Sequence, residues 1–205
     1  ERTAMHKYTF NQPGEANLLL DLQNGLVFNS KNIRYRVLEG EVEMLDNKTI
    51  AGYNRVRGWV ARYFYYMIVF DRPYTVKKEL PQEEGEKAKR FILEFDLKEG
   101  ESVQVKVALS TVGIEGAKMA LDKENPGWNF ESIKAETNGK WNDMLSLVEV
   151  EGTEEEKMNF YTSMYHLFIQ PTNIADIDGK YRGANDSIFV SSTGYYYSTF
   201  SWWDT

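Results

Sequence analysis

The 205-residue chain carries 24 basic and 31 acidic side chains, a formal net charge of −7, and 42% of its residues are hydrophobic. This apolar content is typical of a folded domain and excludes an acidic disordered tail. The negative charge argues against nucleic-acid and anionic-membrane partners. No apolar run approaches the roughly 20 residues of a membrane-spanning helix. The lack of cysteine excludes disulfides and a cysteine nucleophile but leaves the cellular compartment open.

The first half of the sequence has the pattern of an antiparallel β-sandwich. Up to about residue 113, short segments rich in β-branched and aromatic residues alternate with clusters of Gly, Pro, Asn and Asp. No helical stretch of the length that a parallel crossover needs separates them. In Val103–Val107, apolar residues alternate with Gln104 and Lys106, which predicts a half-buried strand with one charged face. The expected strands are His6–Phe10, Ala16–Leu22, Asn32–Glu39, Glu41–Leu45, Thr49–Arg57, Trp59–Phe70, Lys77–Leu80, Ala88–Leu97 and Ser102–Thr111.

The second half has a helical apolar period, and three helices are expected at Gly116–Glu124, Asn129–Val148 and Thr153–Gln170. Gly139 weakens the second helix, which could therefore form as two pieces. Thr153 and Glu156 form a capping-box pair, which fixes the start of the third helix. The apolar stripe of this last helix needs partners that the few residues after it hardly supply. We expect those partners to lie in a missing portion of the chain.

The two ends of the sequence also suggest a longer parent protein. Residue 1 is Glu, so we expect any targeting segment to have been removed. The last residues, from Tyr195 to Thr205, are strongly aromatic and stop without a turn or a cap. Exposed aromatic surface of that extent is normally buried by neighbouring structure. We therefore expect this chain to be a fragment.

The loop that begins at Asp176 has the residue types of a calcium loop. Asp176 and Asp178 are spaced by one residue before the turn glycine Gly179, but Lys180 stands where a third acid is needed. A tight turn, in which the Asp side chains bond backbone N–H groups, is therefore favoured over a metal site. The histidines His6 and His166 have no second His or Cys nearby, so both are expected to be packing residues. Nucleotide-binding and Gly-x-Ser-x-Gly motifs are lacking.

The aromatic segment Trp202-Trp203-Asp204, which three tyrosines precede, could bind carbohydrate. Sugar sites need flat rings against the C–H faces of the sugar and carboxylates that accept hydrogen bonds from its hydroxyls. An aromatic core segment is the alternative. Sequence spacing cannot identify a pair of glycosidase carboxylates, because that pair is defined by its separation across the sugar.

These motifs, in this order, resemble the glycoside hydrolase family 92 exo-acting α-mannosidases, which are large two-domain enzymes common in gut Bacteroides. The resemblance implies that residues 1–125 are the later part of an N-terminal β-sandwich domain (supersandwich-like). It implies that 126–151 is a helical linker and that 152–205 is the start of an (α/α)6 catalytic barrel. The matching segments are Thr3–Phe10, Leu18–Leu22, Gly58-Trp59, Tyr63–Tyr65, Val69–Pro73, Trp141-Asn142, Val150–Glu155, Phe160–His166, Asp176–Gly183 and Ser201–Thr205.

The same resemblance implies a calcium-dependent, inverting exo-α-mannosidase with a preference for α-1,2 linkages, acting on mannose-containing glycans such as N-glycans. The catalytic acid, the base and the calcium ligands are expected in later barrel segments, so no catalytic or metal-binding residue is expected in this chain. The chain alone is therefore expected to be inactive. Asp204 and Trp203 match a motif expected to contact the terminal mannose, and Asp178 and Tyr181 match a motif of unassigned role. The rest of the barrel is the expected protein partner, and the expected location is extracytoplasmic.

Two other classes of function stay open at this point. A non-catalytic carbohydrate-binding β-sandwich would stack glycans on exposed rings such as Trp59 and Trp203. A scaffold domain that braces a neighbour is the third hypothesis, and the helix from Thr153 onward favours it over a free-standing lectin.

Overall fold

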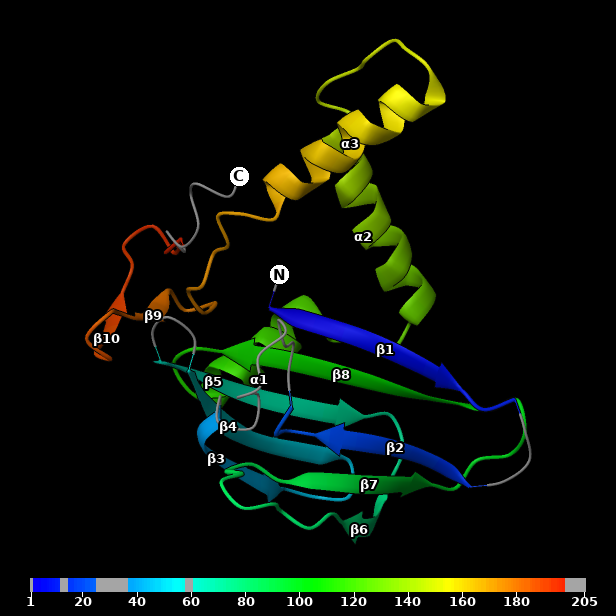
Figure 1. The fold of residues 1–205 in the computed structure, drawn as a ribbon, viewed down its shortest axis with the longest axis vertical. Coiled ribbons are helices and arrows are strands. Elements are labelled where there is room, and N and C mark those ends of the chain that lie inside the picture. Colours follow the sequence, from blue (N-terminus) through cyan, green and yellow to red (C-terminus); the bar gives the residue numbers. More distant parts are fainter. Residues whose placement is uncertain (1, 12–14, 25–36, 58–60, 198–205) are drawn as a thin grey trace.

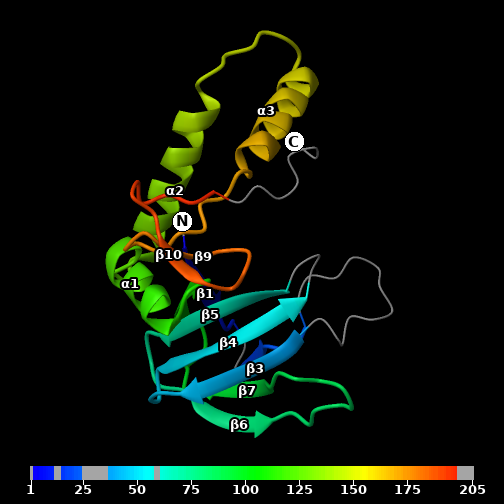
Figure 2. The same ribbon diagram turned by 90° about the vertical axis from the view of Figure 1, so that its left-hand side faces the viewer.

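The computed structural model describes residues 2–11, 15–24, 37–57 and 61–197 (Figure 1). Two antiparallel sheets pack face to face, which confirms the predicted β-sandwich (Figures 1 and 2). The larger, five-stranded sheet has the order β1 (Thr3–Thr9), β8 (Ser102–Ser110), β5 (Ala61–Phe70), β4 (Thr49–Arg57) and β3 (Val37–Met44). The smaller, three-stranded sheet has the order β2 (Ala16–Asp21), β7 (Arg90–Phe95) and β6 (Thr75–Glu79).

The main core lies between these two sheets. Side chains alternate across a strand, so Ile68 and Phe70 of β5 point at the smaller sheet, where they meet Leu93 and Phe95 of β7. The Phe70 and Phe95 ring centroids are 5.3 Å apart. Leu93 is only 1% exposed, and buried residues alternate with half-buried ones along β7, as expected for a strand with one face in the core.

Helix α1 (Ile114–Glu124) covers the outer face of the larger sheet and makes a second core. The small side chains of Ala117 and Ala120 let the helix lie close to Ala108 of β8. This layer corrects one expectation about β8. Lys106 was expected on a charged face, yet it is 5% exposed, because α1 and the segment after it cover that face.

Helices α2 (Phe130–Leu145) and α3 (Glu154–Phe168) extend away from the sandwich (Figures 1 and 2). Helix α2 is one continuous helix across Gly139, not two pieces. The predicted capping box is confirmed, since the Thr153 hydroxyl accepts from the Glu156 N–H and the Glu156 carboxylate accepts from the Thr153 N–H. The two helices meet where the Trp141 and Tyr165 rings lie 4.7 Å apart. None of the described helices combines the length and the apolarity needed to cross a membrane.

Two further differences from the sequence analysis concern the strands. The strands expected at Asn32–Glu39 and Glu41–Leu45 are a single strand, β3, with a register shift between Val37 and Glu39. Residues 32–36 and Trp59 lie outside the described residues. A short hairpin, β9 (Lys180–Arg182) with β10 (Ile188–Val190), was not predicted. The apolar faces of α2 and α3 are largely exposed, and Met164 is the one residue of the two helices that is buried.

Candidate functional site

The predicted turn motif forms the entry to the β9–β10 hairpin. The Asp176 carbonyl accepts from the Gly179 N–H at 2.9 Å, and Gly179 has a φ of +79°, which favours glycine. Asp178 accepts from the Lys180 N–H at 3.1 Å and pairs with the Lys180 ammonium at 2.6 Å. Partial burial disfavours ionisation of Asp178, but the bonds from Lys180 outweigh this effect and lower the pKa of the Asp178 carboxyl. The motif is thus a tight turn, as the sequence favours.

Asp176 has a different role, because its side chain points away from the turn and into the sandwich. The residue is 3% exposed, and its carboxylate accepts a 2.7 Å hydrogen bond from the Ser110 hydroxyl at the end of β8. A Cβ on Gly116 of α1 would overlap this carboxylate. Burial raises the pKa of Asp176, and the bond from Ser110 only partly offsets that effect. Asp176 therefore joins the hairpin to both the sheet and α1.

Tyr181, the second predicted site residue of the hairpin, lies in the middle of a stack of three aromatic rings. Its ring centroid lies 3.8 Å from that of Tyr196 and 5.7 Å from that of Phe189, with interplanar angles of 13° and 29°. The Tyr196 N–H donates to the Asn173 amide oxygen at 3.0 Å, which holds this segment beside the chain that enters the hairpin. The structure brings Tyr181 to the aromatic segment, whereas the Asp178 side chain is engaged with Lys180.

The other two tyrosines of this segment form an exposed pair. The Tyr195 and Tyr197 rings are parallel within 5° at 5.9 Å, and they are 55% and 49% exposed. Flat, exposed rings with a polar hydroxyl at one end suit the stacking of sugar rings. The predicted contact residues Trp203 and Asp204 come six and seven positions after Tyr197 in the sequence, and they lie outside the described residues.

Arg182 anchors the hairpin to the larger sheet, a role that the sequence analysis missed. Its guanidinium donates to the Thr111 carbonyl at 2.7 Å and to the Val112 carbonyl at 3.2 Å. The same group lies over the rings of Tyr63 and Tyr65 of β5, at 4.8 and 5.8 Å from their centroids. No sequence signal links these groups, because Tyr65 and Arg182 are 117 positions apart.

The two histidines are not packing residues, contrary to the expectation from sequence. His6 is exposed on β1, where its ring stacks on that of Tyr8 at 5.9 Å. His166 is exposed on α3 beside Tyr165. Within the described ranges, no three His, Cys, Asp or Glu side chains come together as a metal site requires.

Two family models match the chain. The glycosyl hydrolase family 92 N-terminal domain matches residues 1–110, and the glycosyl hydrolase family 92 catalytic domain matches residues 116–205. A comparison with curated proteins found no match.

Solved structures of this family have the same fold. The family 92 α-mannosidase BT3965 from Bacteroides thetaiotaomicron superposes with a TM-score of 0.86 at 26% identity, over 100% of this chain and 28% of that one. Its complex with mannoimidazole gives 0.83 at 25% identity, with the same coverage of 100% and 28%. An inverting family 92 mannosidase from the same organism gives 0.80 at 20% identity, again over 100% and 28%. The chain spans 28% of the length of these enzymes. The two matching models together show that this chain belongs to glycosyl hydrolase family 92.

Proposed function

We propose that this chain is part of a calcium-dependent, inverting exo-α-mannosidase that removes terminal mannose from glycans, with a preference for α-1,2 linkages. Membership of glycosyl hydrolase family 92 and the likeness to a family 92 α-mannosidase at 26% identity support this proposal. The mannoimidazole complex of that relative further supports mannose as the sugar bound. N-glycans are the proposed natural substrates, and an extracytoplasmic location is proposed with them.

The proposed role of this chain in binding mannose rests on one observation, the aromatic stack on the β9–β10 hairpin. The stack of Tyr181 on Tyr196 holds the segment that ends at Tyr197, and Tyr195 and Tyr197 of this segment present exposed rings. In the proposed site, Trp203 stacks on the terminal mannose and the Asp204 carboxylate accepts hydrogen bonds from its hydroxyls. Tyr181 positions this segment, and Asp178 keeps the turn before the hairpin in shape.

Hydrolysis with inversion needs two further carboxyl groups. One protonates the leaving oxygen, and the other activates water on the opposite face of the sugar. We propose that both belong to barrel segments that this chain does not include, and that the remaining barrel is its protein partner. The part of the chain that the structure describes offers no acidic cluster that fits calcium. We propose that the same barrel segments hold the ion.

The exposed apolar side chains of α3 are consistent with such a partner. Met158 and Leu167, two large apolar side chains of this helix, are 66% and 54% exposed, and Met164 is its only buried residue. A helix of this kind needs packing partners to be stable. Neighbouring barrel helices would supply them.

Hydrolysis of α-1,2-mannobiose tests the proposal. We expect the full-length parent protein to release mannose, to lose that activity with a calcium chelator, and to regain it when calcium is restored. We expect the 205-residue chain alone to release none. Release by this chain would place the catalytic carboxylates within it, and a parent protein that binds but never cleaves mannosides would favour the carbohydrate-binding alternative. Proton NMR of the first product anomer tests inversion.

A further inference from the structure

The exposed tyrosines Tyr195 and Tyr197, named here the tyrosine pair, do not share the contacts of Tyr196 between them. The rings of the pair are parallel within 5°, with centroids 5.9 Å apart, whereas the Tyr196 ring stacks on Tyr181. Side chains of an extended segment alternate between its two sides in this way. The stack on Tyr181 therefore uses one side of the segment and leaves the tyrosine pair together on the other.

Hydrogen bonds hold the backbone of this segment on both sides of Tyr196. The Tyr196 N–H donates to the Asn173 amide oxygen at 3.0 Å, and the Tyr196 carbonyl accepts from the Ile174 N–H at 2.9 Å. The Tyr195 carbonyl accepts from the Ser191 hydroxyl at 2.7 Å. The backbone that carries the tyrosine pair is therefore fixed before a ligand binds, so that less conformational entropy is lost on binding.

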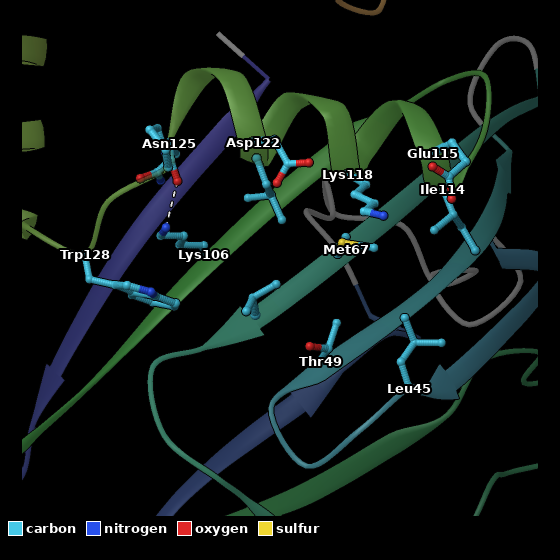
Figure 3. Close-up of a pocket in the computed structure, with 13 residues that line it drawn as sticks. Leu45, Thr49, Met67, Lys106, Ile114, Glu115, Lys118, Asp122, Asn125 and Trp128 are labelled. Atoms are coloured by element: carbon cyan, nitrogen blue, oxygen red, sulfur yellow. Dashed lines mark hydrogen bonds between the residues drawn. The ribbon is translucent and has the colours of Figure 1, made fainter.

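The rings of the tyrosine pair are free, in contrast to the indole that lines the hollow beside α1. In that hollow of about 520 Å³, the Lys106 ammonium lies over the Trp128 ring, 4.2 Å from its centroid (Figure 3). Among the described residues, no cationic group lies over Tyr195 or Tyr197, and each ring contacts no ring but the other. With 55% and 49% of their surface exposed, both residues keep ring surface that a ligand can reach.

The chemistry of the segment indicates which ligand the tyrosine pair suits. From Ser187 to Trp203 the sequence contains no charged side chain. A charged ligand would therefore find no opposite charge in the segment that carries the rings. Flat rings with a hydroxyl at one end suit a neutral molecule that has an apolar face and polar groups around it. A pyranose has C–H groups on its face and hydroxyls around its edge.

An exo-acting enzyme holds the terminal sugar at its catalytic centre, so the other units of the glycan lie on the leaving-group side. Trp203 comes six positions after Tyr197, and a chain of that length spans at most about 20 Å. We propose that Tyr195 and Tyr197 bind a second sugar unit of the glycan, on the leaving-group side of the terminal mannose. The tyrosine pair thereby sets a preference for oligosaccharides over single mannosides. The inference rests on the proposed function, which it deepens.

Initial-rate kinetics of the full-length parent protein with α-1,2-mannotriose test the inference. The double variant Tyr195→Ala/Tyr197→Ala should raise KM about tenfold at an unchanged kcat, because each ring contributes about threefold to binding before and during the reaction. The inhibition constant of methyl α-mannopyranoside, which carries no second sugar, should not change. Tyr195→Phe/Tyr197→Phe keeps both rings and should keep the KM of the unmodified protein. Tyr8→Ala is the matched control, since it removes a ring that is 42% exposed on β1, and it should change neither constant.

An unchanged KM in the double Ala variant would overturn the inference, and so would an equal loss of affinity for methyl α-mannopyranoside. A lower melting temperature with an unchanged KM would also overturn it, because the rings would then pack against the rest of the barrel. If the double variant does not fold, each single Ala variant should raise KM about threefold.

The proposed function can fail separately from this inference. If the unmodified protein releases no mannose, the proposed function is refuted, and calorimetric titration of the same proteins with α-1,2-mannotriose tests the tyrosine pair. We then expect the double Ala variant to bind about tenfold more weakly than the unmodified protein. Equal binding by the two proteins, or no binding by the unmodified one, would overturn the inference. Mannose release with a KM that the double Ala variant leaves unchanged would refute only the inference.

Discussion

Arg182→Met tests how the hairpin is attached to the sandwich. Methionine keeps most of the apolar stem but removes the guanidinium that bonds the Thr111 and Val112 carbonyls and lies over Tyr63 and Tyr65. It also removes the 2.9 Å bond from Arg182 to the Asp186 carbonyl within the hairpin. The β9–β10 hairpin should therefore detach more readily, while the sandwich core stays intact.

The expected magnitude follows from these contacts. Each hydrogen bond from the half-buried guanidinium to a carbonyl of the sandwich contributes about 1 kcal/mol, the typical net value for a protein hydrogen bond, because solvent weakens the effect of the charge. Each ring beneath the guanidinium adds about 0.5–1 kcal/mol. Losing all these contacts should lower the free energy of local opening of the hairpin by about 3 kcal/mol. At about 1.4 kcal/mol for each factor of ten, this loss makes the open state roughly 100-fold more populated, so the amide hydrogens of the hairpin should exchange roughly 100-fold faster.

Hydrogen exchange followed by mass spectrometry measures this opening peptide by peptide. We expect faster exchange in residues 180–197 and no change in β7, which lies in the other sheet. The matched control is Arg57→Met at the exposed end of β4, which should leave the hairpin unchanged. If Arg182→Met leaves hairpin exchange unchanged, or accelerates it no more than Arg57→Met does, Arg182 is not the anchor inferred here.

Three other predictions concern stability, and urea unfolding checks each of them. Gly116→Ala should lower the free energy of unfolding by about 1–3 kcal/mol, because the new methyl group overlaps the Asp176 carboxylate. Gly139→Ala, where the new methyl group meets no atom within 4 Å, should raise it by about 0.5–1 kcal/mol. Equal effects of the two substitutions would refute the close approach of Gly116 to Asp176. Leu93→Ala, in the core, should lower the free energy of unfolding by about 2–5 kcal/mol. Leu147→Ala, at a site that is 73% exposed, should lower it by less than about 0.5 kcal/mol. Because burial raises the pKa of Asp176 above its unfolded value, its ionisation opposes folding at pH 7 and ceases to do so as the pH falls through the folded pKa toward 3.8. The stability of the chain relative to Asp176→Asn should therefore be lower at pH 7 than near pH 4, and a difference that does not change with pH would contradict this role of burial.

The strands of the sandwich were largely predictable, since their signals are local. Thr49–Arg57 has the same bounds in the structure, and the capping box at Thr153 sets the start of α3 as expected. Tertiary context decided the features that were missed. Gly40 does not interrupt β3, because the strand pairs with β4 on both sides of it. Lys106 alternates as a solvent-facing residue would, and only the packing of α1 buries it.

The candidate site was predictable only in part. The turn at Asp178 follows from its own sequence, because its hydrogen bonds are made within three residues. The partners of Asp176 and Arg182 lie 66 and 71 residues away, and no local pattern indicates them. The three-residue strands of the hairpin are too short to show a period. The assignment of Trp203 and Asp204 to the mannose site stays a prediction.

The most direct test of whether Trp203 and Asp204 form part of the mannose site is mannose release by the full-length parent protein carrying Asp204→Asn. Asparagine keeps the shape, but it replaces one accepting oxygen with an NH2 group and leaves the other oxygen without charge. The loss of one charged hydrogen bond and the weakening of the second together cost about 3 kcal/mol, so kcat/KM for α-1,2-mannobiose should fall roughly 100-fold. Asp96→Asn, at an exposed position after β7, should leave it unchanged. An Asp204→Asn protein that releases mannose as fast as the unmodified one would contradict the assignment.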